Sequence, residues 1–326
     1  MDPNMKTNTR ETAVSRRRFL AGAGLTAVAT WLGSRGLLAQ SDADGGVVGQ
    51  MRAEAATARI TVEALRGNVS VLMGSGGNIA VSTGRDGKLL VDAGMIASRP
   101  RITEALAAIS AAPVKRVINT HWHFDHTDGN EWLHGSGATI LAHVNTRKRL
   151  STATRVEGWG FTFPPSLAGA LPTEVFEKGR RLRFNGAAIE LTHYGPAHTD
   201  TDITVHFADS DILHLGDLWW NGHYPFIDYS TGGSINGTIR AVEATLARVT
   251  GKMLVIPGHG PVGGKRELTE FRDMLRTTRD AVAALKKQGK SLAETVAARP
   301  TAAHDAKWGG FLIKGDAFTG LVYAGV

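Results

Sequence analysis

One short segment constrains this chain more than any other, because it places four potential metal ligands within six residues. The segment is THWHFDH at 120–126, and its candidate ligands are His121, His123, Asp125 and His126. It follows residues 114–120, which are predicted to form a buried strand that ends where the ligands begin. Imidazole and carboxylate are the ligands that zinc takes at catalytic sites, which keep a position open for water. Taken alone, the segment is also compatible with a histidine-rich surface loop.

Three later segments repeat the same arrangement and argue against a surface loop. His198 follows GPA at 195–197, Asp217 follows LG at 215–216, and His259 lies within PGHG at 257–260. Each polar residue comes shortly after an apolar strand-like run and next to or near glycine or proline. Polar side chains at strand ends, where loops meet, are typical of functional sites. The pattern therefore predicts that these residues join the first segment in one metal centre.

The combined order resembles that of the metallo-β-lactamase superfamily. The motif H-x-H-x-D-H, then a histidine, an aspartate and P-G-H-G, covers roughly residues 60–265. This family includes class B β-lactamases, glyoxalase II, lactonases, persulfide dioxygenases and RNA-processing nucleases. The resemblance implies an α/β fold, the four-layer αβ/βα sandwich, with metals at one edge between two sheets.

The resemblance also implies individual roles for these residues. One metal would be held by His121, His123 and His198, and a second by Asp125, His126 and His259. Asp217 would bridge the two metals, and Asp92 in VDAG at 91–94 would support the ligands without binding metal. The expected cofactor is two Zn²⁺ ions per chain, although iron and manganese also accept histidine and carboxylate ligands.

One departure from the family bears on the substrate. Some class B lactamases have cysteine where this chain has Asp217, and an antibiotic-binding lysine where it has Trp220. The missing lysine weakens the expectation of β-lactam hydrolysis. The segment WWNGHYP at 219–225 follows a ligand closely, which makes four residues candidates for contact with substrate: Trp219, Trp220, His223 and Tyr224. Packing in the core is the alternative interpretation for them.

These observations predict a metal-dependent hydrolase acting on a small-molecule acyl substrate, namely a lactam, lactone or thioester. Two metals can share a hydroxide, which would attack the carbonyl carbon. Asp125 and Asp217 are the expected catalytic carboxylates, with Asp125 orienting the hydroxide. Three alternatives remain: an iron oxygenase of the persulfide type, a phosphodiesterase acting on nucleic acid, and a metal-binding protein without turnover.

Residues 1–39 resemble a twin-arginine export signal. The motif SRRRFL at 15–20 precedes an apolar run at 21–32, and LLAQ at 37–40 offers a cleavage site. Arg35 interrupts the apolar run, whereas a spanning helix needs about 20 apolar residues. The sequence therefore predicts a periplasmic or secreted protein that meets the membrane only during export. An uncleaved anchor is the alternative.

Charge and composition place further limits on function. The chain carries a net charge of +7, and residues 1–39 contain six basic and two acidic residues, so +4 of it lies in the leader. The remaining sequence shows no basic cluster, which argues against a nucleic-acid partner. There is no cysteine, so neither disulfides nor thiolate ligands are possible. The sequence leaves the oligomeric state open.

The pattern of apolar residues predicts two batches of strands, each followed by helices. This segregation favours two sheets packed face to face with helices outside. Residues 40–58 are small and polar and predict a tether, while 59–326 form the predicted hydrolase domain. Within that domain, Asn185-Gly186 predicts a hairpin, and 156–172 reads as a loop.

Overall fold

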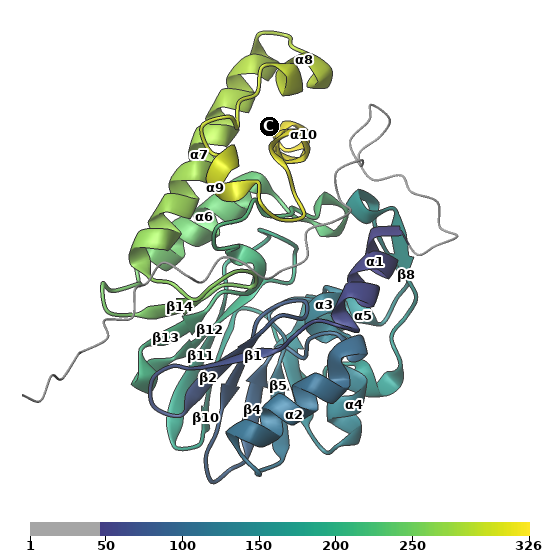
Figure 1. Cartoon of the computed structure of the whole chain (residues 1–326), viewed down its shortest axis with the longest axis vertical. Helices are drawn as coiled ribbons and strands as arrows, with labels where there is room; N and C mark the ends of the chain where they lie inside the picture. Colours follow the sequence, from purple (N-terminus) through teal and green to yellow (C-terminus); the bar gives the residue numbers. More distant parts are fainter. Residues whose placement is uncertain (1–45) are drawn as a thin grey trace, which may run out of the picture. The chain divides into compact units, whose positions relative to one another are not determined.

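The computed structural model describes residues 46–326 (Figure 1). The predicted export signal at 1–39 and the first part of the predicted tether lie outside the described residues. Within residues 46–326, none of the helices combines enough length with enough apolar side chains to span a bilayer.

The first sheet has seven strands in the order β1-β2-β3-β4-β5-β6-β9. Their bounds are β1 Thr61–Ala64, β2 Val69–Met73, β3 Ile79–Ser82, β4 Lys88–Val91, β5 Val114–Ile118, β6 Thr139–His143 and β9 Glu174–Phe176. Strands β1 to β4 pair antiparallel, and β4, β5, β6 and β9 pair parallel. Parallel neighbours need crossover connections, which run through α2 (Arg99–Ile109), α3 (Phe124–Thr127), α4 (Asn130–Gly135) and α5 (Val144–Leu150).

The second sheet has five strands in the order β10-β11-β12-β13-β14. Their bounds are β10 Gly179–Phe184, β11 Ala187–His193, β12 Ile203–Phe207, β13 Ile212–His214 and β14 Leu254–Ile256. The predicted hairpin at Asn185-Gly186 is confirmed, since both residues have positive φ, 54° and 79°. A two-residue type I′ turn requires positive φ at both positions. The last pair, β13 and β14, is parallel and is connected through α6 (Ile235–Leu246).

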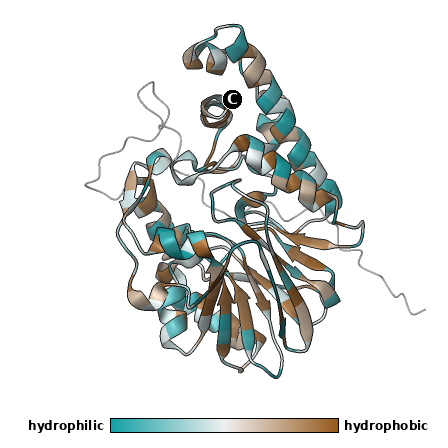
Figure 2. Ribbon diagram, turned by 180° about the vertical axis from the view of Figure 1, so that it is seen from behind, coloured by the Kyte–Doolittle hydropathy of each residue, from teal (hydrophilic) through white to brown (hydrophobic). Residues whose placement is uncertain are grey.

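The two sheets pack face to face around an apolar layer. Leu89, Val91 and Ile118 from the first sheet share one buried cluster with Leu191 and Phe207 from the second. This packing removes apolar surface from water, which is the main driving force for folding. The strands are accordingly among the most hydrophobic segments in Figure 2.

Helices cover the outer face of each sheet. Ile102 and Leu106 of α2 pack with Leu133 of α4 against the first sheet. Val242 of α6 and Phe271 of α7 (Lys265–Lys287) share a buried cluster with the second sheet. The order helix, sheet, sheet, helix confirms the α/β four-layer αβ/βα sandwich.

The remaining elements lie around these layers. They are the two-stranded sheet of β7 (Thr154–Val156) and β8 (Phe161–Phe163), and the helices α8 (Leu292–Ala297), α9 (Asp305–Trp308) and α10 (Gly315–Ala324). The prediction of a loop over 156–172 was wrong in part, because β8 and short 3₁₀ turns occupy much of it. Strands this short carry too few residues for a recognisable period.

The predicted tether differs from the structure in its second part, because Gly46–Ala55 forms helix α1. Val48 and Ala55 are buried, and the Ser98 hydroxyl donates a hydrogen bond to the Ala55 carbonyl at 2.6 Å. The Arg52 guanidinium lies over the Phe124 ring, 5.4 Å from its centroid. The small residues of this segment suggested a linker, but tertiary contacts hold it as a helix against the domain.

The central apolar layer yields a stability prediction. Phe207→Ala should lower the free energy of unfolding by about 3–5 kcal/mol, because it removes a ring that is 1% exposed between the sheets. Val62→Ala on β1 is the matched control, since Val62 is 44% exposed; its effect should stay within about 0.5 kcal/mol. Denaturant titration of both variants makes the comparison, and equal losses would contradict the packing described.

Candidate metal centre

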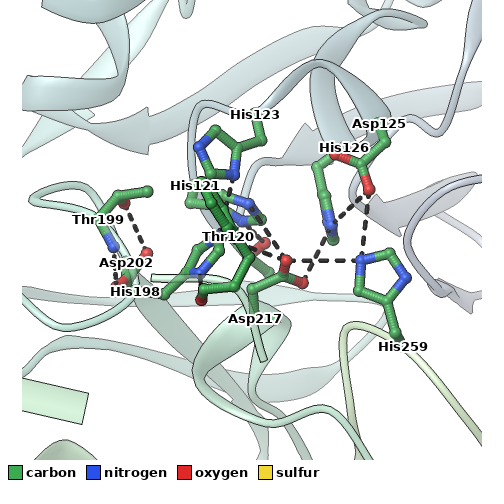
Figure 3. Close-up of polar contacts among 12 residues, drawn as sticks. Thr120, His121, His123, Asp125, His126, His198, Thr199, Asp202, Asp217 and His259 are labelled. Carbon is green, nitrogen blue, oxygen red and sulfur yellow. Dashed lines mark hydrogen bonds and ion pairs between the residues drawn. The ribbon is translucent and has the colours of Figure 1, made fainter. Parts of the chain in front are cut away.

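Loops that follow strands of both sheets bring seven buried histidine and aspartate side chains together (Figure 3). His121 follows β5, His198 follows β11, Asp217 follows β13 and His259 follows β14. Helix α3 contributes Asp125 and His126, and His123 is the residue immediately before it. The seven residues form two sets, which are His121, His123, His198 and Asp217, and Asp125, His126 and His259. The structure therefore unites all the residues that the sequence singled out as ligands.

In the first set, hydrogen bonds orient two histidine nitrogens toward a common point. His198 Nδ1 lies 2.7 Å from the Phe226 carbonyl, to which it can only donate, so its Nε2 keeps a lone pair. His123 Nε2 lies 3.0 Å from the Asp228 carboxylate, which frees Nδ1 for a ligand. These two free nitrogens, His198 Nε2 and His123 Nδ1, are 2.9 Å apart. Burial lowers the pKa of His198 to about 4, which keeps this imidazole neutral.

The second set surrounds the Asp125 carboxylate. Asp125 Oδ2 lies 3.4 Å from His126 Nε2 and 3.3 Å from His259 Nε2. Burial alone would raise the pKa of Asp125, but His126 and His259 outweigh it and hold the pKa well below its ordinary range. Asp125 is therefore an anion in the interior of the protein.

Asp217 contacts both sets. Its Oδ2 lies 3.4 Å from His198 Nε2 and 3.4 Å from His259 Nε2, and its Oδ1 lies 3.1 Å from His126 Nε2. Burial works to raise the pKa of Asp217, but the histidines around it hold the pKa well below its ordinary value. The position of this carboxylate between the two sets suits a bridging ligand.

The geometry fits two metal ions. Two ligand atoms on a tetrahedral zinc, each at about 2.0–2.1 Å from it, lie about 3.4 Å apart. The spacings of 2.9–3.8 Å within the first set bracket that value. At this centre, His121 Nε2, His126 Nε2 and Asp217 Oδ1 are buried without a hydrogen bond, although His126 Nε2 and Asp217 Oδ1 are in ion-pair contact with each other. Because unsatisfied buried polar atoms are costly, cations facing these atoms would account for them, and the two sets are consistent with a binuclear site.

Asp92 supports this centre from the end of β4. It accepts hydrogen bonds from the Thr120 amide at 2.7 Å, the Thr120 hydroxyl at 2.8 Å and His126 Nδ1 at 2.7 Å. Its φ of 71° lies in the left-handed region, which is uncommon for a residue with a side chain. Such a conformation persists where several contacts determine it together. Asp92 thus positions the ligand His126 directly, and it positions His121 through the preceding residue Thr120.

Sequence reasoning missed two contributors to the centre. Asp228 accepts from His123 and from the hydroxyls of Ser230 and Thr231, but no family motif marked it. Trp159, in the segment predicted as a loop, places its ring 4.7 Å from His123 and 5.2 Å from Phe226 between centroids. A carboxylate shortly after the WWNGHYP segment was the available signal for Asp228.

Two of the four residues predicted to face substrate lie in the core instead. Trp219 is completely buried, and Tyr224 stacks on Phe318 and donates to Asp305 Oδ1 at 3.0 Å. The prediction was wrong for this pair, because neighbouring positions in an irregular segment can point in opposite directions. Trp220 packs on His259, with centroids 4.3 Å apart, and His223 lines a cavity beside the centre.

Two positions beside the ligands have room for glycine and for no larger residue. A Cβ on Gly258 would overlap the Asp217 carboxylate, and one on Gly77 would overlap the His126 ring. Asn78 holds the same region together, because its side-chain amide donates to the Pro257 and Gly260 carbonyls at 2.9 Å each. The PGHG segment is therefore packed tightly against the metal-ligand side chains.

Asp228 provides a test of how the ligands are oriented. Asp228→Asn should lower metal affinity by about 10–100-fold, because it removes the charge that holds His123 with Nδ1 toward the centre. Asp273→Asn, on the exposed face of α7, is the control and should leave affinity unchanged. Competition with a chromogenic chelator measures both. Equal affinities in the two variants would show that Asp228 does not position His123.

Comparisons with known proteins agree with this centre. The model of the Metallo-beta-lactamase superfamily matches residues 73–259. The chain is 28% identical over 214 residues to a metallo-beta-lactamase type 2 from Bacillus sp. (strain 170), covering 66% of this chain and 74% of that protein. It is 25% identical over 173 residues to a hydroxyacylglutathione hydrolase from Polaromonas sp., covering 52% of this chain and 58% of that protein.

Solved structures show the same fold. The DIM-1 metallo-beta-lactamase superposes with a TM-score of 0.54 at 20% identity, covering 67% of this chain and 98% of that one. The sec-alkyl sulfatase PisA1, as a double mutant, superposes with a TM-score of 0.62 at 14% identity, covering 84% of this chain and 51% of that one. Since the family model spans more than half of the 326 residues, the chain belongs to the metallo-beta-lactamase superfamily and is a metal-dependent hydrolase of that kind.

Proposed function

We propose that this protein is an exported binuclear zinc hydrolase that cleaves an acyl bond in a small molecule, namely a lactam, lactone or thioester. The observation that carries the proposal is the Asp217 carboxylate, which lies within 3.4 Å of ligand nitrogens of both histidine sets. A carboxylate between two sets of imidazoles suits a pair of zinc ions. Similarity to a metallo-beta-lactamase and to a hydroxyacylglutathione hydrolase supports hydrolysis at an acyl group.

The proposed division of ligands follows the two sets. His121, His123 and His198 would hold one zinc, while Asp125, His126 and His259 would hold the other, with Asp217 between them. Bound zinc would act as a Lewis acid and lower the pKa of a coordinated water to about 7.

The side chains of this chain have their own tasks in the reaction. Asp125 is ionised and buried, so it can accept a hydrogen bond from the attacking water and orient it. Trp220 covers one side of His259 and limits the access of bulk water there. Since Trp220 offers no cation for a substrate carboxylate, lactones and thioesters fit this site better than classical β-lactam antibiotics do.

Replacing a ligand tests the hydrolytic proposal. His121→Ala and Asp217→Ala should each abolish turnover of the zinc-loaded protein while leaving it folded, because each removes a ligand of the first set. His206→Ala on β12 is the control, because His206 belongs to neither set. Initial rates on a chromogenic β-lactam, a lactone and a thioester, with zinc and then with chelator, provide the measurement. Unchanged turnover in both ligand variants would refute the proposal.

Metal content separates this proposal from its rivals. Two zinc ions per chain with chelator-sensitive acyl hydrolysis would support it. One iron per chain, with oxygen consumption on a persulfide, would instead favour the dioxygenase alternative. Turnover of an alkyl sulfate and of no acyl substrate would contradict the acyl assignment, and bound metal with no turnover would favour a metal-binding protein.

Export is the second part of the proposal, and it rests on the SRRRFL motif at 15–20. Replacing Arg16 and Arg17 by lysine should retain the protein in the cytoplasm, because twin-arginine signals are read through the arginine pair. Replacing Lys6 by arginine is the control and should leave export intact. Cell fractionation with immunoblotting measures the distribution. Equal periplasmic amounts of both variants would contradict twin-arginine export.

A further inference from the structure

A cavity of about 410 Å³ adjoins the metal centre. His259, His223 and Met95 lie in its wall, and further wall residues come from three other parts of the chain. These are the α1 segment with Met51 and Ala58, the end of β2 with Met73, and the loop between α9 and α10 with Phe311 and Leu312. Its volume falls within the range of about 300–1,000 Å³ typical of small-molecule sites.

The chemistry of this wall is predominantly apolar. Methionine, alanine, phenylalanine and leucine side chains line it, and methionine adapts readily to apolar ligands. Among the described residues, the wall contains one carboxylate, Glu54 of α1, and neither lysine nor arginine. An anionic tail beside Glu54 would thus meet a negative charge and no lysine or arginine, whereas the metal centre lies at the His259 end of the wall.

Two of its residues are exposed apolar side chains without a structural explanation elsewhere. Phe311 is 38% exposed and Leu312 is 44% exposed, and they are adjacent in the chain. Phe311 also lies 4.8 Å from His223 and 6.1 Å from His259 between ring centroids, which places it at the mouth of the metal centre. Adjacent exposed apolar side chains beside a reactive centre indicate a binding surface.

Part of the cavity wall comes from outside the segment that matches the family model. That match covers 73–259, whereas Met51 and Glu54 precede it and Phe311 and Leu312 follow it. The metal ligands thus come from the part that matches the family model, whereas the cavity wall combines residues of that part with residues of the two flanking segments. The flanking segments therefore contribute wall residues, such as Met51 and Phe311, but no ligand of the two metal sets.

We propose that this cavity binds the uncharged aliphatic acyl chain of the substrate, with the scissile carbonyl directed toward His259. This inference rests on the proposed acyl hydrolysis and names its substrate class, neutral lactones or thioesters with an apolar tail. Glu54 disfavours tails that end in a carboxylate. The apolar wall continues to the metal-ligand residue His259, and the described lining residues include neither lysine nor arginine. Both observations support this occupant over an anionic one.

A homologous series of neutral thioesters tests the inference on the zinc-loaded protein. The probes are acetyl, butanoyl, hexanoyl and octanoyl thioesters of N-acetylcysteamine, with thiol release as the signal. Each buried methylene should raise kcat/KM by up to about fourfold, the equivalent of about 0.8 kcal/mol. The succinyl thioester, which matches butanoyl in length but ends in a carboxylate, should react about tenfold more slowly than butanoyl.

Variants of the wall sharpen this test. Phe311→Ala and Leu312→Ala should flatten the dependence on chain length, with the largest loss of kcat/KM for the octanoyl thioester. Leu167→Ala, at an apolar side chain that is 68% exposed outside the cavity, is the matched control and should keep the full dependence. Glu54→Gln should raise the ratio of the succinyl rate to the butanoyl rate about threefold, because it removes a repulsive charge at an exposed site.

Binding distinguishes failure of the inference from failure of the proposed function. Non-hydrolysable thioethers with the same alkyl chains, measured by calorimetry, should bind more tightly as the chain lengthens, and Phe311→Ala should weaken the longest one most. Hydrolysis with a flat chain-length series would overturn the apolar cavity and leave acyl hydrolysis standing. Chain-dependent binding without hydrolysis of any thioester or lactone would support the cavity and refute the proposed reaction.

Discussion

The structure depends on the stabilisation of two buried carboxylates, Asp125 and Asp217, by the histidines around them. An isolated charge in the interior is costly, yet the pKa of each carboxylate is held well below its ordinary value. That arrangement is stable only when opposite charge is fixed beside it, as protons on imidazole or as metal ions. Strand ends provide the required rigidity, because both sheets are anchored in the apolar layer between them.

Hydrogen bonds from the ligands to neighbouring carboxylates extend this rigidity outward from the metal centre. Asp92 accepts from His126 and from the backbone before His121, while Asp228 accepts from His123. Hydrogen bonds of this kind fix the ring orientation of a histidine ligand. The reactive core is therefore rigid, whereas the adjoining cavity is lined by adaptable methionines and exposed apolar side chains. This contrast suits a reactive centre of fixed geometry beside a cavity whose wall can adapt to its ligand.

Much of this arrangement was predictable because its signals are local or belong to a family. Asn185-Gly186 has turn chemistry that admits one hairpin geometry, and apolar runs followed by histidine or aspartate marked the strand ends. The resemblance then assigned the ligands to two metals. Helix α1 and Asp228 escaped prediction, because what holds them in place is contacts with residues far away in the sequence, such as Ser98 and His123.

The sequence by itself determined the ligand set and the sandwich fold, since ligand chemistry and strand periodicity are properties of short segments. Tertiary structure alone decided which side chains of 219–225 meet the site, because Trp219 and Tyr224 turn into the core whereas Trp220 and His223 face His259 and the cavity. It also decided that α1 and the Phe311 loop meet at one cavity. Residues so far apart along the chain become neighbours only through tertiary packing, and a short stretch of sequence carries no signal for such a contact.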